Sequence, residues 1–320
     1  MPTAHASQFD TQWELGLETA YGTPLTPASS YKALPCTEDP KNDAVKPNPY
    51  SVPVIGGGTS EPLAENNGIG TFSSSARATC RPTDIRMKTI WSSFYQKNSG
   101  FASTPFTDTF APYTSNPTTF RGYTIHKGFL PSSSGGTFEI AGSLCRRWKL
   151  SSQVDGPLLL EHEWQGLGGQ MVNVARTATT LAGTGLYMHQ DTVLTIGGAA
   201  IHCSKQEIEA KNSAGAFYGT SQVPTGVVLG PITLAGSFTV SAREHGPTLL
   251  SALAAATYQA YSLKYGTAGT AGYYEVVGDI LLLDVDQEAE NGIELLTFKF
   301  GMGKSTTAHV CSATTVAAFS

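Results

Sequence analysis

The chain contains one long sequence pattern twice. TFEIAGSLCRRWKLSSQVDG begins at Thr137, YYEVVGDILLLDVDQEAENG begins at Tyr273, and the two stretches align without a gap. Matching residues recur at a constant spacing of 136, namely Glu139 and Glu275, Gly142 and Gly278, Leu144 and Ile280, and Gly156 and Gly292. This spacing is too long for a solenoid repeat, whose units run to roughly 20–50 residues. The pattern therefore predicts a whole domain that is present in two copies.

The match continues upstream in the same order. YTIHKG from Tyr123 resembles YSLKYG from Tyr261, and the Pro-Thr pair at Pro82 matches the Pro-Thr pair at Pro247. Still earlier, PCTEDPKN resembles HCSKQEIEAKN, and the spacing between the copies changes only where a loop can absorb the difference. The sequence therefore predicts a first domain over residues 1–178, a linker over 179–190 and a second domain over 191–320.

The secondary-structure signals favour a mainly β fold. Alternation of β-branched and aromatic residues predicts strands at Thr71–Thr79, Arg121–Phe129, Thr137–Ala141, Leu144–Ser151, Leu158–Gln165, Thr192–His202, Gln206–Lys211, Ile232–Ala242, Ala260–Tyr265, Tyr273–Val285 and Ile293–Gly301. Each copy also holds one apolar helical stretch, with Pro82 or Pro247 in its first turn, where a missing N–H costs little. We expect two tandem, similar β-sandwich or barrel domains, each with one packed α-helix.

The first copy carries an insertion that the second copy lacks. Residues 98–120 are rich in Thr, Ser and Pro, and a structureless loop of this length is usually functional or disordered. Exposed aromatic side chains on such an arm favour docking onto a partner surface. We therefore predict a contact arm that carries Phe101, Phe106, Phe110 and Tyr113.

Charge and cysteine content exclude several classes of protein. Only 14% of the residues are charged, and the net charge of −5 falls on residues 181–320, which hold 6 basic and 11 acidic residues. Nothing here resembles the basic footprint of a nucleic-acid-binding protein, so any contact with DNA has to be non-adhesive. The five cysteines lack the spacing of a zinc site or disulfide framework. Neither a signal peptide nor an apolar run of about 20 residues is present, so we expect no membrane span.

No motif predicts an enzyme. GMGKST from Gly301 lacks the glycine that a phosphate-binding loop needs five residues before its Gly-Lys pair. In LLLEHEW, strand alternation sends Glu161 and Glu163 to one face and His162 to the other, so the three cannot converge on a metal. DVDQEAENG from Asp284 lacks the residue order of a calcium loop and predicts a solvated or channel-facing hairpin.

The remaining histidines are interpreted as isolated, both in His202-Cys203 and in Arg243-Glu244-His245. We therefore expect no catalytic residue, no metal site and no cofactor.

The residues resemble a known family, the tail tube proteins (major tail proteins) of long-tailed bacteriophages. WELGLETAYGTP is similar to the opening of that family, and YTIHKGF followed by FEIAGSLCRRWKLSSQVDGPLLLEHEWQGLGG is similar to its first-domain core. VLTIGGAAIHCSKQEIEAKN, LAGSFTVSAREHGPTLLSAL and YEVVGDILLLDVD are similar to a second domain. The similarity covers most of the chain in order, and residues 98–120 fall outside it.

The resemblance implies a structural protein of the virion, made in the cytoplasm of the bacterial host. Members stack as rings into a tube through which double-stranded DNA enters the host, and they contact other tail proteins. Members with two fused domains form trimers with pseudo-sixfold symmetry, so we expect a homotrimer. A bore that holds DNA without binding it has to be short of Lys and Arg, and we predict an acidic lumen that includes Asp284, Asp286, Glu288 and Glu290. The alternatives are a monomeric β-rich binding module, for example in host recognition, and a capsid decoration or tail-terminator protein.

Overall fold

The computed structural model of the 320-residue chain describes residues 11–24, 31–38, 40–51, 67–97, 107–113, 117, 119–129, 137–172, 180–181, 183–221, 224–290, 292–303 and 308–312. At 11–12, 42–51, 67–72, 129, 171, 290 and 308 the description covers the backbone alone.

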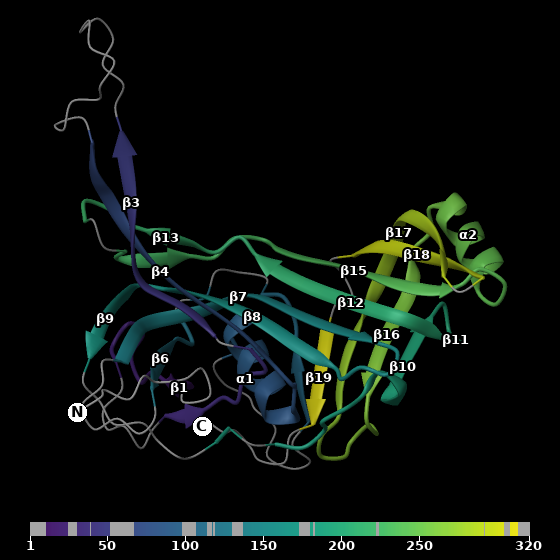
Figure 1. The fold of residues 1–320 in the computed structure, drawn as a ribbon, viewed down its shortest axis with the longest axis horizontal. Helices are drawn as coiled ribbons and strands as arrows, with labels where there is room; N and C mark the ends of the chain where they lie inside the picture. The colour runs from purple at the N-terminus through teal and green to yellow at the C-terminus, as the bar shows by residue number, and fades with distance from the viewer. Residues whose placement is uncertain are drawn as a thin grey trace, which may run out of the picture.

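The first half contains nine strands and one helix within the described residues. They are β1 (Thr11–Leu17), β2 (Lys32–Ala33), β3 (Lys41–Ser51), β4 (Asn67–Cys80), α1 (Asp84–Phe94), β5 (Thr107–Phe110), β6 (Tyr123–Phe129), β7 (Thr137–Gln153), β8 (Leu159–Gly166) and β9 (Gly168–Val172). The β3–β4 hairpin rises out of the body of the molecule (Figure 1).

The second half begins with a short 3-10 helix, η4 (His189–Asp191). The elements that follow are β10 (Thr192–Ile196), β11 (Ala199–Ile201), β12 (Cys203–Asn212), β13 (Gly215–Phe217), β14 (Gly226–Val228), β15 (Ile232–Ser241), α2 (Gly246–Ala255), β16 (Gln259–Tyr265), β17 (Tyr274–Glu290), β18 (Ile293–Met302) and β19 (Ala308–Ser312). The prediction of a mainly β fold with a helix in each half is confirmed.

The strands pair in the same order in both halves, and every ladder between the described strands is antiparallel. In the first half β1 pairs with β6, β6 with β7, β7 with β8, β8 with β4, and β4 with β3. In the second half β10 pairs with β16, β16 with β17, β17 with β18, β18 with β15, and β15 with β12. β9 and β19 also occupy matching places, because they pair with the N-terminal parts of β7 and β17.

A single sheet of 17 strands runs through both halves. β7 of the first half pairs with β12 of the second, and β5 pairs with β19. The division into domains at 1–178 and 191–320 therefore stays a prediction.

Two glycine-dependent features change the predicted strands. The expected strands Thr137–Ala141 and Leu144–Ser151 are one continuous strand, β7, with Gly142 at φ +59° between them. A side chain at Gly142 would collide with Leu167, since a Cβ there would lie 2.6 Å from the Cγ of Leu167. The expected strand Thr192–His202 is instead two strands, β10 and β11, because Gly197 and Gly198 form a turn with positive φ.

The two helices begin differently. Thr83 caps α1, and its Oγ1 accepts a hydrogen bond from the backbone N–H of Arg86 at 3.3 Å. The prediction that Pro82 lies in the first turn is therefore wrong, because Pro82 precedes the cap. Pro247 does lie in the first turn of α2. Neither of these two helices, which are the α-helices of the described chain, is long and apolar enough to cross a membrane.

α1 lies in the core of the molecule. All 11 residues of α1 are buried, because the helix packs against β7, β19 and β5. The ring of Trp91 packs against Trp148 of β7, Phe110 of β5 and His309 of β19, with centroid separations of 5.7, 5.8 and 5.0 Å. Segments from both halves therefore enclose the first helix.

Candidate assembly surfaces

The two halves are joined edge to edge by β7 and β12. The C-terminal part of β7 forms an antiparallel ladder with β12. Ion pairs cross the same edge: Lys149 Nζ lies 2.8 Å from Glu207 Oε2, and the guanidinium of Arg147 contacts the carboxylate of Glu209. This closed junction therefore joins basic residues of β7 to acidic residues of β12.

Arg147 is the centre of the charge network at this junction. Besides Glu209, its guanidinium contacts Glu161 and lies 2.7 Å from the Oε1 of Glu163. Partial burial lowers the pKa of Arg147, but the hydrogen bonds to Glu209 and Glu163 outweigh it, so the pKa is raised. Partial burial raises the pKa of Glu209, and hydrogen bonds from Lys211 and Arg147 reverse this and lower it. Both partners are therefore charged at neutral pH.

The equivalent edges of β17 and β3 are open, meaning that no described strand pairs with them. β17 pairs with β16 on one side through its N-terminal part and with β18 through its C-terminal part. The second side of Leu283–Glu290 therefore has no ladder among the described residues. β3 occupies in the first half the place that β12 occupies in the second half. Among the described strands, β3 pairs with β4 alone. β3 rises on the left of Figure 1, and the β17–β18 hairpin lies on the right.

The two helices differ in how they are covered. α1 is buried along its whole length, whereas only Gly246 and Leu249 of α2 are buried. The sequence of α2, GPTLLSALAA, contains no charged residue. An apolar helix is normally buried on most of its surface, yet Leu250 is 41% exposed and Ala254 and Ala255 are also exposed. α2 thus presents an uncovered apolar face at the right-hand end of Figure 1.

Further apolar side chains lie near the C-terminal end of β18. Tyr258 is 62% exposed and Leu283 is 61% exposed. Leu283 lies beside Gly301, where a Cβ would be 3.4 Å from its Cδ1, and Tyr258 lies beside Gly303, where a Cβ would be 3.1 Å from its Cε1. Exposed apolar groups gathered in this way mark interaction surfaces.

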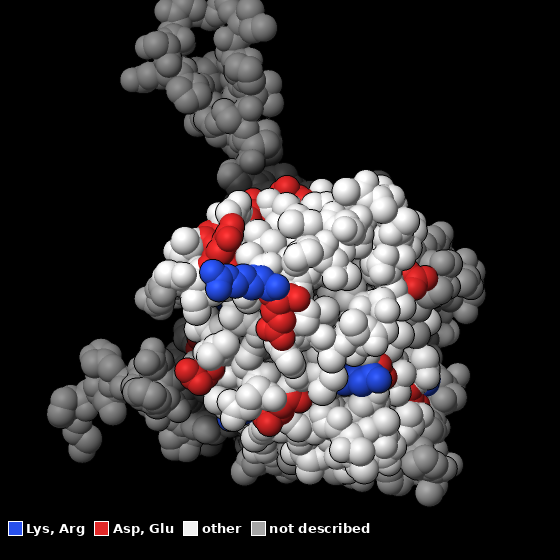
Figure 2. Space-filling model, turned by 90° about the vertical axis from the view of Figure 1, so that its right-hand side faces the viewer, with Lys and Arg blue, Asp and Glu red and all other residues white. Residues whose placement is uncertain are grey.

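The β17–β18 hairpin carries the predicted acidic residues. Asp284, Asp286 and Glu288 alternate along β17 and are exposed, whereas only the backbone of Glu290 is described. Lys299 Nζ of β18 lies 3.1 Å from Asp284 Oδ2 and 2.7 Å from Asp286 Oδ2. The hydrogen bond from Lys299 lowers the pKa of Asp284. Figure 2 shows the right-hand end of the molecule in Figure 1 as mainly uncharged, with several small acidic groups and fewer basic groups, which lie against acidic ones.

The predicted aromatic arm divides into two parts. Phe101 and Phe106 lie outside the described residues. Phe110 belongs to β5 and is 1% exposed in the core, so it is not a docking residue. The hydroxyl of Tyr113 donates to the carbonyl of Gly230 at 2.6 Å and accepts from Asn212 at 3.0 Å. The expectation of exposure is therefore wrong for Phe110, because this part of the insertion packs against the second half.

The LLLEHEW strand has the two faces that alternation predicts. Glu161 and Glu163 lie on the outer face with Arg147, and His162 is buried on the other face. Trp164 Nε1 donates to His162 Nδ1 at 2.8 Å. Burial lowers the pKa of His162 to about 3, so the ring is neutral at physiological pH.

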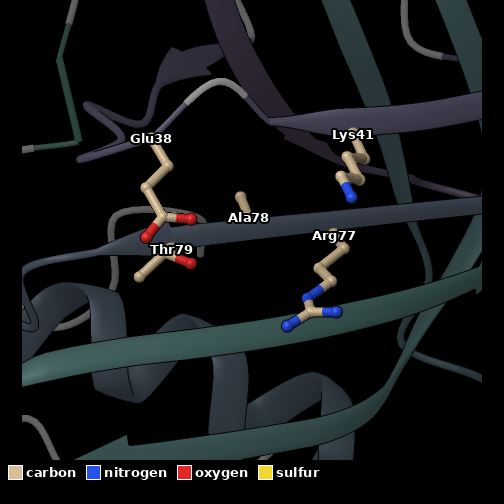
Figure 3. Close-up of a pocket in the computed structure, with 5 residues that line it drawn as sticks. All are labelled: Glu38, Lys41, Arg77, Ala78 and Thr79. Atoms are coloured by element: carbon tan, nitrogen blue, oxygen red, sulfur yellow. The ribbon is translucent and has the colours of Figure 1, made fainter.

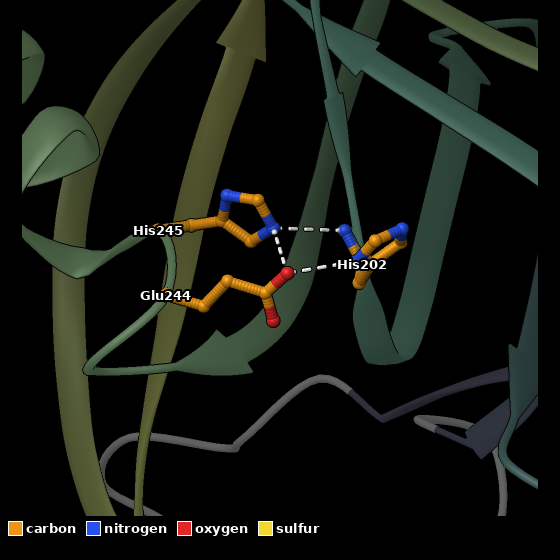
Figure 4. A group of neighbouring side chains, drawn as sticks. All are labelled: His202, Glu244 and His245. Atoms are coloured by element: carbon orange, nitrogen blue, oxygen red, sulfur yellow. Dashed lines mark hydrogen bonds and ion pairs between the residues drawn. The ribbon is translucent and has the colours of Figure 1, made fainter.

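One group of residues that the sequence left apart is brought together. His202, Glu244 and His245 each offer a ligand atom, and these atoms lie within 4.8 Å of one another (Figure 4). His202 Nδ1 lies 2.8 Å from Glu244 Oε1, and His245 Nε2 lies 3.4 Å from the same oxygen. The prediction that these histidines are isolated is wrong. The antiparallel pairing of β12 with β15 brings the two segments together, and no local sequence motif predicts this contact.

A small hollow lies where β3 begins. It is lined by Glu38, Lys41, Arg77, Ala78 and Thr79 and has a volume of about 110 Å³ (Figure 3). Ligand pockets are usually about 300–1,000 Å³, so this hollow is too small for a typical organic substrate.

The candidate assembly surfaces of this molecule are the open edges of β17 and β3, the uncovered apolar face of α2 and the acidic β17–β18 hairpin.

No protein-family model matches the chain, and no curated protein sequence matches it.

Proposed function

We propose that this chain is a structural subunit that joins to copies of itself as rings, which stack into the tail tube of a long-tailed bacteriophage. The observation that carries the proposal is the pair of open edges. Among the described residues, β17 and β3 have no strand partner at the edges where their equivalents β7 and β12 pair with each other. Two unlike surfaces on one chain generate a head-to-tail contact, which produces a ring when its rotation closes.

The apolar face of α2 supports the same arrangement. α1 is covered by β5 and β19, the second of which belongs to the other half, whereas α2 has no such cover within the described chain. A neighbouring copy would cover α2 as α1 is covered. With domains at 1–178 and 191–320, three chains supply six similar units, so the proposed ring is a homotrimer with pseudo-sixfold symmetry.

The proposed bore conducts double-stranded DNA without binding it. Asp284, Asp286 and Glu288 carry three negative charges against the one positive charge of Lys299, which favours repulsion of phosphates. Glu290 continues the same alternation. The role is structural and non-enzymatic, in the virion, with residues 98–106 and their Phe101 and Phe106 as the proposed contact to the next ring or to other tail proteins.

Native mass spectrometry and negative-stain microscopy of the tag-free protein test this function. We expect hollow rings or tubes and a ring mass of three 33.7 kDa chains. A ring of six chains would overturn the trimer but keep the tube. A protein that stays monomeric at every concentration and in its virion would reject self-assembly and favour a binding module.

A further inference from the structure

We propose that the open edge of β17, Leu283–Glu290, binds β3 of a second copy of this chain as an antiparallel ladder in one defined register. The inference rests on the proposed function and adds to it the two contacting strands and the residues that face each other. The template is the closed junction between β7 and β12 within the chain, which the strand order makes equivalent.

Pairing with the neighbouring strands fixes which residues of β7 and β17 correspond. Arg147 of β7 stands opposite Glu163 of β8, and Asp284 of β17 stands opposite Lys299 of β18. Both positions directly follow a register shift, between Cys145 and Arg147 in one strand and between Leu282 and Asp284 in the other. Arg147 therefore corresponds to Asp284, a spacing of 137 rather than the 136 of the gap-free alignment.

The same rows of the sheet relate β3 to β12. Lys41 lies opposite Arg77, which lies opposite Glu163. In the second half Glu207 lies opposite Ser237, which lies opposite Lys299. Lys41 therefore corresponds to Glu207.

A second correspondence comes from the residues four positions before Arg77 on β4 and before Ser237 on β15, which are Ser73 and Thr233. Ser73 pairs with Lys46, and Thr233 pairs with Lys211. Lys46 therefore corresponds to Lys211, and by the intervening row Asp43 corresponds to Glu209.

Transferring the closed junction onto these positions predicts the contacts between chains. Within the chain, Ser151 faces Glu207 and Arg147 faces Lys211. Between chains, Glu288 therefore faces Lys41, and Asp284 faces the register position of Lys46. The intervening Asp286 faces the position of Asp43, and its carboxylate already lies 2.7 Å from Lys299 Nζ.

The signs of charge are exchanged between the two junctions. At the closed junction Arg147 and Lys149 of β7 form ion pairs with Glu209 and Glu207 of β12. Lys211 of β12 faces Arg147 in the same ladder. At the proposed junction β17 is acidic and β3 contributes Lys41 and the register position of Lys46. In this register Glu288 would face Glu207 on β12 but faces Lys41 on β3, so the exchange of sign at this row discriminates against the wrong pairing.

Charge reversal tests the register. We expect Glu288→Lys and Lys41→Glu each to raise the protein concentration needed for ring formation by about tenfold. The double variant should recover assembly to near the wild-type concentration. A double variant that assembles no better than either single variant would overturn the register.

Cysteine cross-linking supplies a readout that does not depend on assembly strength. Chains with Glu288→Cys are mixed with chains with Lys41→Cys and oxidised, and we expect a covalent dimer on a non-reducing gel. Chains with Glu244→Cys, mixed with the same Lys41→Cys chains, are the control and should stay single. Rings that form without the specific cross-link would reject this interface but keep the tube, whereas wild-type chains that never associate would reject both.

A different observation carries a second proposal. We infer that His202, Glu244 and His245 bind a divalent transition-metal ion of the zinc type. His202 lies between β11 and β12, and the other two residues lie between β15 and α2. Ligands at about 2.0–2.2 Å from a tetrahedral metal are roughly 3.4 Å apart, which suits three atoms that lie within 4.8 Å of one another.

The tautomer of His245 favours this site. Its Nε2 accepts a hydrogen bond from the backbone N–H of His202 at 3.1 Å, so this nitrogen is unprotonated and holds the lone pair that a metal would bind. Metal binding would exchange this bond for a metal–nitrogen bond at a solvent-exposed position. Two imidazoles and one carboxylate suit zinc rather than calcium or magnesium, which prefer oxygen ligands. Water would complete the coordination, because the thiol of the adjacent Cys203 contacts Gln206 instead.

Isothermal titration of the tag-free full chain with ZnCl₂ tests this site. We expect one Zn²⁺ per chain and no binding of Ca²⁺. His202→Ala and Glu244→Gln should each weaken binding at least about tenfold, whereas His5→Ala, a histidine outside the described residues, should leave it unchanged. Binding that survives in His202→Ala, or no binding by the wild type, would overturn the proposal.

Discussion

His162 shows how one buried residue links stability to pH. Its pKa is lowered to about 3 by burial, compared with an ordinary value of 6.5. Between these values the unfolded chain binds a proton that the folded chain does not, so stability falls as the pH falls below 6.5. Phe298 stands at the matching place of β18, since His162 pairs with Trp148 of β7 and Phe298 pairs with Val285 of β17.

We therefore expect His162→Phe to reduce the acid sensitivity of the fold. Between pH 6.5 and pH 5 the wild type should lose about 2 kcal/mol more unfolding free energy than the variant. Over these roughly 1.5 pH units only the unfolded wild-type chain binds the proton at His162. At pH 7 the variant should be less stable by about 1–2 kcal/mol, because Trp164 loses its acceptor. Urea unfolding at the two pH values measures both effects. Equal pH dependence in the two proteins would contradict the assignment, and the exposed His202→Phe serves as the control.

Arg147 tests how strongly the charge network holds the two halves together. Its side chain is 18% exposed, and Arg147→Met would leave Glu161, Glu163 and Glu209 close together without their shared cation. We expect a loss of about 1–2 kcal/mol in unfolding free energy, because the three carboxylates lose the cation they share in a partly buried site. Each carboxylate keeps one other ion pair, with Arg77, Arg146 or Lys211. Arg77→Met is the control, since that side chain is 49% exposed and its ion pairs should contribute less than about 1 kcal/mol. Similar losses in both variants would show that Arg147 has no special role.

At the scale of elements, α2 separates folding from assembly. Leu250 is exposed on the uncovered face of α2, so Leu250→Lys should leave the melting temperature of the monomer unchanged within about 2 °C. The same change should prevent ring formation, because a lysine would have to be buried against the neighbouring copy. Size-exclusion chromatography with light scattering measures the loss. Val154→Lys, at an exposed position of the β7–β8 turn, should assemble normally.

The sequence predicted some elements better than others, for physical reasons. The long strands β7 and β17 were recognisable because their alternation recurs in two copies. β3 was missed because it carries Pro47 and Pro49, which lack the N–H that a central strand needs but are tolerated at an edge. The one-residue change in spacing at Arg147 and Asp284 was also missed, since bulges leave no gap in the sequence.

The candidate surfaces were predictable only in part. The acidic strip on β17 was found because all its members lie on one strand at alternate positions. The grouping of His202 with Glu244, and the burial of Phe110, depend on contacts between segments that are distant in the chain. The open edges are properties of the sheet order, so they could not be read before the pairings were known.

At the scale of the whole molecule, the proposed bore makes a prediction about DNA. The net charge of −5 falls on the second half, and Asp286 belongs to the strip proposed to face the bore. Assembled wild-type tubes should not retain double-stranded DNA at physiological salt, because phosphate binding requires cationic contacts. Asp286→Lys should still assemble, since its expected neighbour across the junction is the Asp43 position. It should retain DNA in a filter-binding assay, with an affinity that falls as salt rises. Asp155→Lys on an exposed turn adds the same charge elsewhere, so equal retention by both variants would show that the strip does not line the bore.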